Sequence, residues 1–207
     1  MTHLKIAGLA LAGGTAVRMG GGDKPLLEIA GRPMLKRVIA VLSADAAAVA
    51  ISANGDPARF AAFGLPVIPD NPFAGLGPLA GILAGLDWAA GLGADALLTL
   101  PGDTPFVPPG LATRLTPAPA FAESGGESHF LVALWPVPVR QRLRLTLTGP
   151  GPYGVARFGK SIGMRAVAFP AGPPYQFLNV NTPEDLKTAQ AVGTQSFPLP
   201  FGRRNNE

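Results

Sequence analysis

The chain has no cysteine, few charged side chains and no long hydrophobic run. Charged residues make up 14% of the 207 residues, and there are 0 cysteines. Disulfides, thiolate metal sites and thiol nucleophiles are therefore excluded, and we expect a cytoplasmic location. Apolar runs stay well below the roughly 18–20 residues that cross a bilayer, so we expect no membrane association. The basic residues do not cluster with aromatic ones, which argues against nucleic-acid binding.

Glycine and proline are abundant instead. The chain has 27 glycines and 23 prolines, yet 47% of its residues are hydrophobic. A disordered chain has few apolar residues and many charges, so these residues belong to loops of a folded protein. We expect one domain over residues 1–193 and a flexible tail over 194–207. The net charge of +4 suits anionic small molecules.

Apolar segments typical of strands alternate with amphipathic segments typical of helices. Residues 4–11 form a near-continuous apolar run, which predicts a buried parallel strand. A short signal peptide is the alternative, but the run leads directly into a glycine-rich loop, which favours the strand. Further strands are expected at 48–53, 65–68, 94–100, 129–135 and 164–169, with helices between them. This alternation predicts a three-layer α/β/α sandwich with a mostly parallel sheet.

The loop after the first strand resembles a phosphate cradle. Residues 12–24 contain five glycines, whose backbone N–H groups can approach an anion. Arg18 and Lys24 add positive charge that suits a polyphosphate. The Walker A pattern is absent because Pro25 follows Lys24, and the dinucleotide pattern G-x-G-x-x-G is absent too. A flexible loop of small residues is the alternative.

Acidic side chains follow two later strands, at the end of the sheet where ligands bind in open α/β folds. Asp70 could accept hydrogen bonds from a base or a ribose, although Asp-Asn-Pro is also a common turn composition. Asp103 follows a buried run and would face the phosphate loop. Mg²⁺ takes hard oxygen ligands, often one or two carboxylates with substrate phosphates, so we predict that Asp103 holds Mg²⁺. A turn residue is again the alternative.

Two asparagines near the C-terminal end complete the candidate site. Asn179 and Asn181 lie on the same side of an extended segment because side chains alternate there. Their amides can bind phosphate, a pterin edge or metal-bound water without adding negative charge. Thr182 with Asp185 three residues later predicts a capped helix over 183–192.

Five motifs in this order resemble the molybdenum cofactor guanylyltransferase family, within the nucleotidyltransferases of Rossmann-like fold. They are L-A-G-G-T-A-V-R-M-G-G-G-D-K at 11–24, G-R-P-M-L at 31–35, G-P-L-A-G-I at 77–82, P-G-D-T-P at 101–105 and N-V-N-T-P-E-D-L at 179–186. The first motif alone fits many nucleotidyltransferases, whereas the full set is more specific. The resemblance covers residues 4 to about 190.

The resemblance implies transfer of GMP from GTP to molybdenum-bearing molybdopterin, with release of pyrophosphate. Transient contacts with molybdenum-insertion or target-maturation proteins would accompany this role. It also implies catalytic roles for Arg18, Lys24 and Asp103, with Mg²⁺ on Asp103, and places the pterin substrate near Asn179 and Asn181. The implied GTP-binding residues are Leu11, Ala12, Gly13, Gly14, Lys24, Ser52, Asn54, Asp70 and Asp103.

One position departs from the family, and one bears on the choice of base. The family tends to have Asn-x-Asn after the second strand, whereas this chain has Ser52-Ala53-Asn54. Related cytidylyltransferases tend to have Leu-Ala-Ala-Gly in the first motif, and glycine at position 13 leaves room for a purine. The open alternatives are a CTP-dependent molybdopterin cytidylyltransferase, a sugar-phosphate nucleotidyltransferase and a non-catalytic nucleotide sensor.

Overall fold

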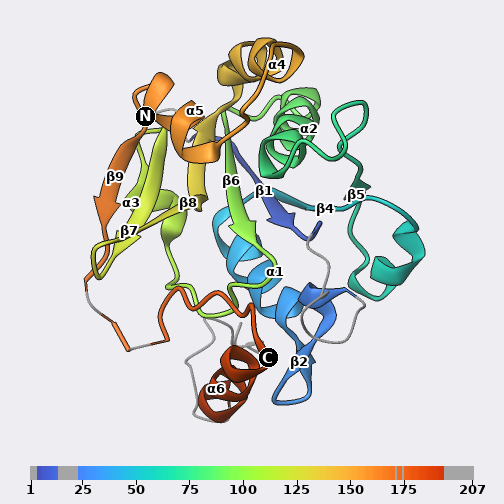
Figure 1. The fold of residues 1–207 in the computed structure, drawn as a ribbon, viewed down its shortest axis with the longest axis vertical. Helices are drawn as coiled ribbons and strands as arrows, with labels where there is room; N and C mark the ends of the chain where they lie inside the picture. Colours follow the sequence, from blue (N-terminus) through green and yellow to red (C-terminus); the bar gives the residue numbers. More distant parts are fainter. Residues whose placement is uncertain (1–3, 14–22, 171, 174, 194–207) are drawn as a thin grey trace, which may run out of the picture.

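The computed structural model describes residues 4–13, 23–170, 172–173 and 175–193. A seven-stranded sheet in the order β5-β4-β1-β6-β8-β7-β9 forms its centre (Figure 1). The strands are β1 (Ile6–Leu11), β4 (Ala48–Ser52), β5 (Val67–Ile68), β6 (Ala96–Pro101), β7 (Ala120–Ser124), β8 (Glu127–Pro136) and β9 (Arg165–Ala168). A separate two-stranded hairpin joins β2 (Glu28–Ile29) to β3 (Arg32–Pro33).

The sheet has a parallel half and a mixed half. Strands β5, β4, β1 and β6 are mutually parallel, whereas β8 runs antiparallel to both β6 and β7. β7 is parallel to β9, so parallel pairings outnumber antiparallel ones. In the parallel half, Leu11 pairs with Ser52 on one side and with Pro101 on the other. The carboxyl ends of β1, β4 and β6 are therefore level with one another.

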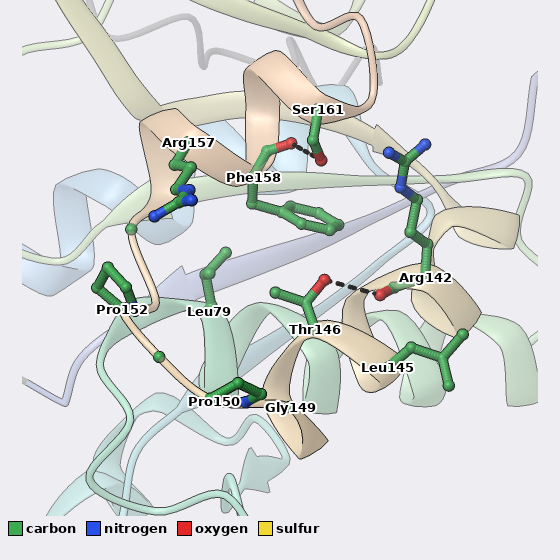
Figure 2. A pocket seen from close by; sticks show the side chains of 12 residues that line it. Leu79, Arg142, Leu145, Thr146, Gly149, Pro150, Pro152, Arg157, Phe158 and Ser161 are labelled. Carbon is green, nitrogen blue, oxygen red and sulfur yellow. Dashed lines mark hydrogen bonds between the residues drawn. The ribbon is translucent and has the colours of Figure 1, made fainter.

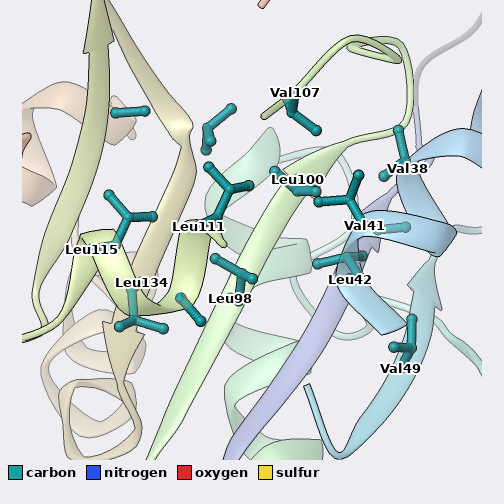
Figure 3. Packing of buried hydrophobic residues seen from close by; sticks show 14 of the residues in the cluster. Val38, Val41, Leu42, Val49, Leu98, Leu100, Val107, Leu111, Leu115 and Leu134 are labelled. Carbon is teal, nitrogen blue, oxygen red and sulfur yellow. The ribbon is translucent and has the colours of Figure 1, made fainter. Parts of the chain in front are cut away.

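Helices cover both faces of the sheet. The main helices are α1 (Met34–Asp45), α2 (Pro78–Gly91), α3 (Leu111–Leu115), α4 (Arg140–Thr148), α5 (Val155–Ser161) and α6 (Pro183–Gly193). Short 3₁₀ turns lie at η2 (Lys24–Leu26), η3 (Pro57–Phe63) and η4 (Val137–Val139). Buried side chains of α1 and α3 form one core with the sheet, as Figure 3 shows, while those of α2, α4 and α5 form a second. The predicted three-layer α/β/α sandwich is confirmed.

A third, smaller core attaches the last helix to the hairpin. Ile29 of β2 and Met34 of α1 pack with Phe106, Val180 and Ala189, all of which are buried. Phe106 lies in the loop after β6, and Val180 lies in the segment before α6. This packing brings the segment that ends at α6 back against the loops of the parallel half.

The expected elements differ from the observed ones in the mixed half. The apolar run at 4–11 forms the central strand β1, as predicted. Strand β7 and helix α5 were not predicted: β7 has only 5 residues and follows Pro117 and Pro119, and α5 follows a segment broken by glycine and proline. Such short elements carry little periodicity. The predicted tail lies outside the described residues, and none of the described helices is long and apolar enough to cross a membrane.

Candidate active site

The site lies at the carboxyl edge of the parallel half. The order of the strands reverses between the neighbours β1 and β6. After β1 the chain continues outward to β4 and β5, and it then crosses back to β6 on the other side of β1. Open α/β sheets bind ligands at such a reversal of strand order. Backbone hydrogen bonds hold the strand ends together: Ala12 N–H donates to Ser52 O at 2.8 Å, and Gly102 N–H donates to Leu11 O at 2.8 Å. These bonds join the ends of β1, β4 and β6 where a ligand would sit.

A cavity of about 440 Å³ opens at this edge, which we call the nucleotide cleft. This volume falls within the usual range for small-molecule sites. Seven of the predicted site residues line it: Leu11, Gly13, Ser52, Asn54, Asp70, Asp103 and Asn179. They come from five segments that are far apart in the sequence: the ends of β1, β4, β5 and β6 with the residues that follow them, and the segment before α6.

Lys24, Asp103 and Asn181 form a polar cluster beside the cleft. Lys24 Nζ lies 2.6 Å from Asp103 Oδ2 and 2.5 Å from Asn181 Oδ1. The Lys24 side chain is only 8% exposed, so the ammonium is held in place by these two partners rather than by water. Val180 N–H also donates to Asp103 O at 2.9 Å. The charge of Lys24 is thus positioned at the cleft before any substrate arrives.

Asp185 fixes the backbone on which Asn181 lies. Its carboxylate accepts hydrogen bonds from the N–H groups of Asn181 and Thr182, both at 2.8 Å, and Thr182 Oγ1 accepts from Asp185 N–H at 3.1 Å. This is the predicted capping box of α6, and it is confirmed. The hydrogen bond from the Asn181 N–H, followed by those from Thr182, lowers the pKa of Asp185 below its usual value. A charged Asp185 therefore supports Asn181, which in turn holds Lys24.

The opposite wall of the cleft carries Asn54 and Asp70. Asn54 Oδ1 accepts a hydrogen bond from Asp70 N–H at 3.1 Å, which orients the Asn54 amide and the loop after β5. One carboxylate oxygen of Asp70, Oδ1, is buried and makes no hydrogen bond within the described part of the chain. An unpaired buried acceptor is costly unless a ligand supplies its donor. Asp70 is therefore a candidate to accept a hydrogen bond from a ligand.

Ser52 and Gly81 meet closely on the cleft wall. A Cβ atom at Gly81 of α2 would lie 2.6 Å from Ser52 Oγ, closer than real Cβ contacts allow. Gly102 is similarly tight, since a Cβ there would lie 3.2 Å from Leu11 O and 3.0 Å from Pro25. The motifs at 77–82 and 101–105 therefore contain glycines because backbone and helix approach each other closely.

Two contributors were not predicted from the sequence. Arg59 of η3 donates to Asn54 O at 2.5 Å and lies 3.1 Å from Asp23 Oδ2, so it joins the loops after β1 and β4. Leu131 of β8 lines the cleft from the mixed half. Arg59 stands in no motif, and Leu131 is one apolar residue in an apolar strand, so neither had a distinguishing signal.

Three predicted site residues are not among the described residues that line the cleft or form the polar cluster. Ala12 is buried, and its N–H donates to Ser52 O. Gly14 and Arg18 lie outside the described residues, so their roles stay predictions. Within the described residues there is no group of three or more histidine, aspartate or glutamate side chains that could hold a metal ion.

A separate cavity of about 410 Å³ lies between α4 and α5 (Figure 2). Arg142 and Arg157 line it on either side of Phe158 in this view, with Leu79 below. None of the predicted site residues lines this cavity. The polar cluster and the carboxylates of the candidate site therefore lie away from this cavity.

Known proteins resemble this chain over nearly its whole length. Residues 8–160 match the MobA-like NTP transferase domain. The molybdenum cofactor guanylyltransferase of Acidiphilium cryptum is 54% identical over 190 residues, covering 92% of this chain and 95% of the relative. That of Rhodobacter capsulatus is 49% identical, covering 94% of this chain and 100% of the relative.

A solved structure shares the fold at lower identity. The molybdopterin-guanine dinucleotide biosynthesis protein A from Archaeoglobus fulgidus superposes with a TM-score of 0.71 at 19% identity, over 92% of this chain and 100% of that chain. At this identity the likeness supports the fold alone. Together with the family match and the close relatives, the residues gathered at the cleft lead to one conclusion: the chain belongs to the molybdenum cofactor guanylyltransferase family.

Proposed function

We propose that this protein transfers GMP from GTP to molybdenum-bearing molybdopterin and releases pyrophosphate. The observation that carries the proposal is the cluster of Lys24, Asp103 and Asn181 at the mouth of the nucleotide cleft. It combines a buried ammonium, a carboxylate and a neutral amide, a set suited to a polyphosphate and a divalent cation. The relatives at about half identity carry this activity in their names.

The reaction requires no covalent intermediate on the protein. An oxygen of the terminal phosphate of molybdopterin attacks the α-phosphorus of GTP, forming a new P–O bond. The bond from the α-phosphorus to the bridging oxygen breaks, and the electron pair leaves with pyrophosphate. The protein aligns attacker and leaving group and offsets their negative charge. Lys24 is positioned to do this for the phosphates, and Arg18 is predicted to assist.

Asp103 fits a Mg²⁺ ligand. It offers a partly exposed carboxylate at the lining of the cleft. Hard oxygen donors with substrate phosphates are what Mg²⁺ usually takes. When bound, Mg²⁺ neutralises charge on the phosphates. Asp103 would hold it on the Lys24 side of the cleft.

Guanine is the base that the cleft suits best. The buried Oδ1 of Asp70 can accept from an N–H of guanine or from a ribose hydroxyl. A Cβ atom at Gly13 would meet nothing within 4 Å, so a methyl there would extend into open space at the cleft that Gly13 lines. Glycine at this position therefore leaves volume for the larger purine. Ser52 could donate one hydrogen bond.

The test is pyrophosphate release with GTP, CTP or ATP in the presence of Mg²⁺ and molybdenum-bearing molybdopterin. We expect release with GTP alone, and only when the acceptor is present. The matched variant is Gly13→Ala, which should lower the preference for GTP over CTP about tenfold, the usual effect of one methyl group in a pocket. Efficient use of CTP by the unmodified protein would contradict the base assignment. Tight GTP binding without pyrophosphate release would instead indicate a nucleotide sensor.

A further inference from the structure

A second cavity adjoins the nucleotide cleft. It has a volume of about 610 Å³, and Asn179 lines both cavities. Strand β8 also connects them, since Leu131 lines the cleft and His129 lines the second cavity. A ligand could therefore occupy the second cavity while its end reaches the cleft beside Asn179.

Two aromatic rings form one wall of this cavity. The His129 imidazole stacks on Phe177 with ring centroids 4.7 Å apart and an angle of 23° between the planes. Phe177 is held from behind by Phe169, whose ring lies edge-on at 5.3 Å. The backbone of Phe177 has φ of 61°, an unusual value for a bulky residue, and its N–H donates to Phe106 O at 2.9 Å. Backbone strain of this kind is concentrated at binding sites.

Three further lining residues have polar side chains that are uncommitted. The side chains of Ser124, Glu127 and Gln176 make no hydrogen bond or ion pair within the described residues. Burial, opposed by the nearby Glu127, lowers the pKa of His129, so its imidazole is neutral near pH 7. The cavity thus offers a flat ring surface, a carboxylate and neutral hydrogen-bonding groups. This combination suits a planar heterocycle with N–H donors and ring-nitrogen acceptors.

We propose that this cavity binds the pterin ring of the acceptor, with His129 stacking against the ring and Glu127 accepting hydrogen bonds from its N–H groups. The inference rests on the proposed function for the identity of the acceptor. The phosphate of the acceptor would then extend past Asn179 toward Lys24 and Asp103. The two substrates therefore occupy adjacent cavities that meet at Asn179. This arrangement orients the attacking phosphate and the α-phosphorus of GTP toward each other.

The test compares variants of the two candidate cavities. His129→Ala and Glu127→Gln alter the proposed pterin cavity, and Arg142→Ala alters the cavity between α4 and α5. Glu127 is exposed, so its substitution leaves folding intact even if His129→Ala does not. We measure KM for molybdenum-bearing molybdopterin, KM for GTP, and kcat at saturating acceptor.

We expect His129→Ala to raise the acceptor KM about tenfold, the usual effect of losing one stacking partner. Glu127→Gln should raise it severalfold, while GTP KM and kcat stay within about twofold. His129→Phe should restore part of the affinity because it keeps the flat ring. An unchanged acceptor KM in both His129→Ala and Glu127→Gln, or a rise only in Arg142→Ala, would overturn the assignment.

A direct binding measurement separates this inference from the proposed function. Metal-free molybdopterin is titrated into the unmodified protein and into His129→Ala without GTP, followed by pterin fluorescence. If the unmodified protein binds molybdopterin in a His129-dependent manner yet releases no pyrophosphate, the proposed function fails and the cavity assignment stands. If it turns over GTP normally while molybdopterin binding does not depend on His129 and Glu127, the cavity assignment fails and the function stands.

Discussion

The parallel half of the sheet and the mixed half build their cavities in different ways. The nucleotide cleft is made chiefly from residues at the ends of β1, β4, β5 and β6 and in the loops that follow them, so most contributing residues lie within two positions of a strand end. The proposed pterin cavity instead combines β8 and the β7–β8 turn with the segment before α6. The first relies on backbone geometry and glycine, whereas the second relies on side chains from segments about 50 residues apart.

This difference predicts which property of the protein a substitution in each half will change. In the parallel half, positions such as Gly81 are close-packed, and the buried side chain of Lys24 is held by hydrogen bonds to Asp103 and Asn181. In the mixed half, most of the lining side chains are half-exposed or exposed, with Phe177 as a buried exception. We therefore expect substitutions in the cleft to cause large losses of turnover or stability, and substitutions in the proposed pterin cavity to change the affinity for the acceptor.

The largest expected effect comes from Asp103. Asp103→Ala should lower pyrophosphate release at least about 100-fold, because it removes the predicted Mg²⁺ ligand and leaves Lys24 without its carboxylate. Asp103→Asn keeps a hydrogen-bond acceptor for Lys24 and should lose activity with the fold retained. Release is measured over a range of Mg²⁺ concentrations, with circular dichroism to monitor folding.

Asp95 provides the matched control for Asp103. It lies just before β6, at the opposite end of the strand, where its Oδ2 accepts from Lys5 N–H at 2.8 Å. Asp95→Asn should leave pyrophosphate release within about twofold, because it lies on the far edge from the cleft. Normal turnover by Asp103→Ala at saturating Mg²⁺ would end the metal assignment.

The next effect tests close packing in the parallel half. Gly81→Ala should lower the free energy of unfolding by about 1–3 kcal/mol, because its methyl group would overlap Ser52 Oγ. The double variant Gly81→Ala with Ser52→Ala removes that oxygen and should recover most of the loss. Urea unfolding of both variants and of Ser52→Ala alone measures the coupling. Additive effects of the two substitutions would show that the contact with Ser52 is not the reason why position 81 requires glycine.

The smallest effect concerns the support beneath Asn181. Asp185→Asn should lower stability by about 1 kcal/mol at pH 7, because it weakens the capping box. The pKa of Asp185 is lowered in the folded protein, so its contribution is present above the unfolded-state value near 3.8 and is lost as the pH falls through the lower folded value. Urea unfolding at pH 7, 5 and 3 checks this. A difference from the unmodified protein that is equally large at pH 3 would contradict the role of the charge.

Local chemistry made much of the parallel half predictable. The apolar runs at β1 and β6 are buried on both faces, and the glycine and proline segments follow them directly, so strand and loop could be located together. Thr182 and Asp185 were recognisable as a cap because their contact spans only three residues. Asp70 and Asp103 were identifiable from their place at strand ends.

The mixed half was less predictable because its elements are short and its contacts are distant. Strand β7 is defined by pairing with β8 and β9 rather than by its own five residues. His129 and Phe177 stack across 48 positions, and no local pattern joins them. Arg59 likewise acquires its role only when η3 packs beside the loops after β1 and β4.

The sequence by itself determined the three-layer architecture, the edge of the sheet that carries the site, and most residues of the nucleotide cleft. These depend on hydrophobic runs, on turn residues and on the order of the segments along the chain, all of which can be recognised from short stretches of sequence. Only the tertiary structure decided that Lys24 is held between Asp103 and Asn181, and that a second cavity meets the cleft at Asn179. The Lys24 cluster joins side chains 79 and 157 positions apart, and the second cavity likewise joins distant segments, so both arrangements are set by the packing of the whole domain.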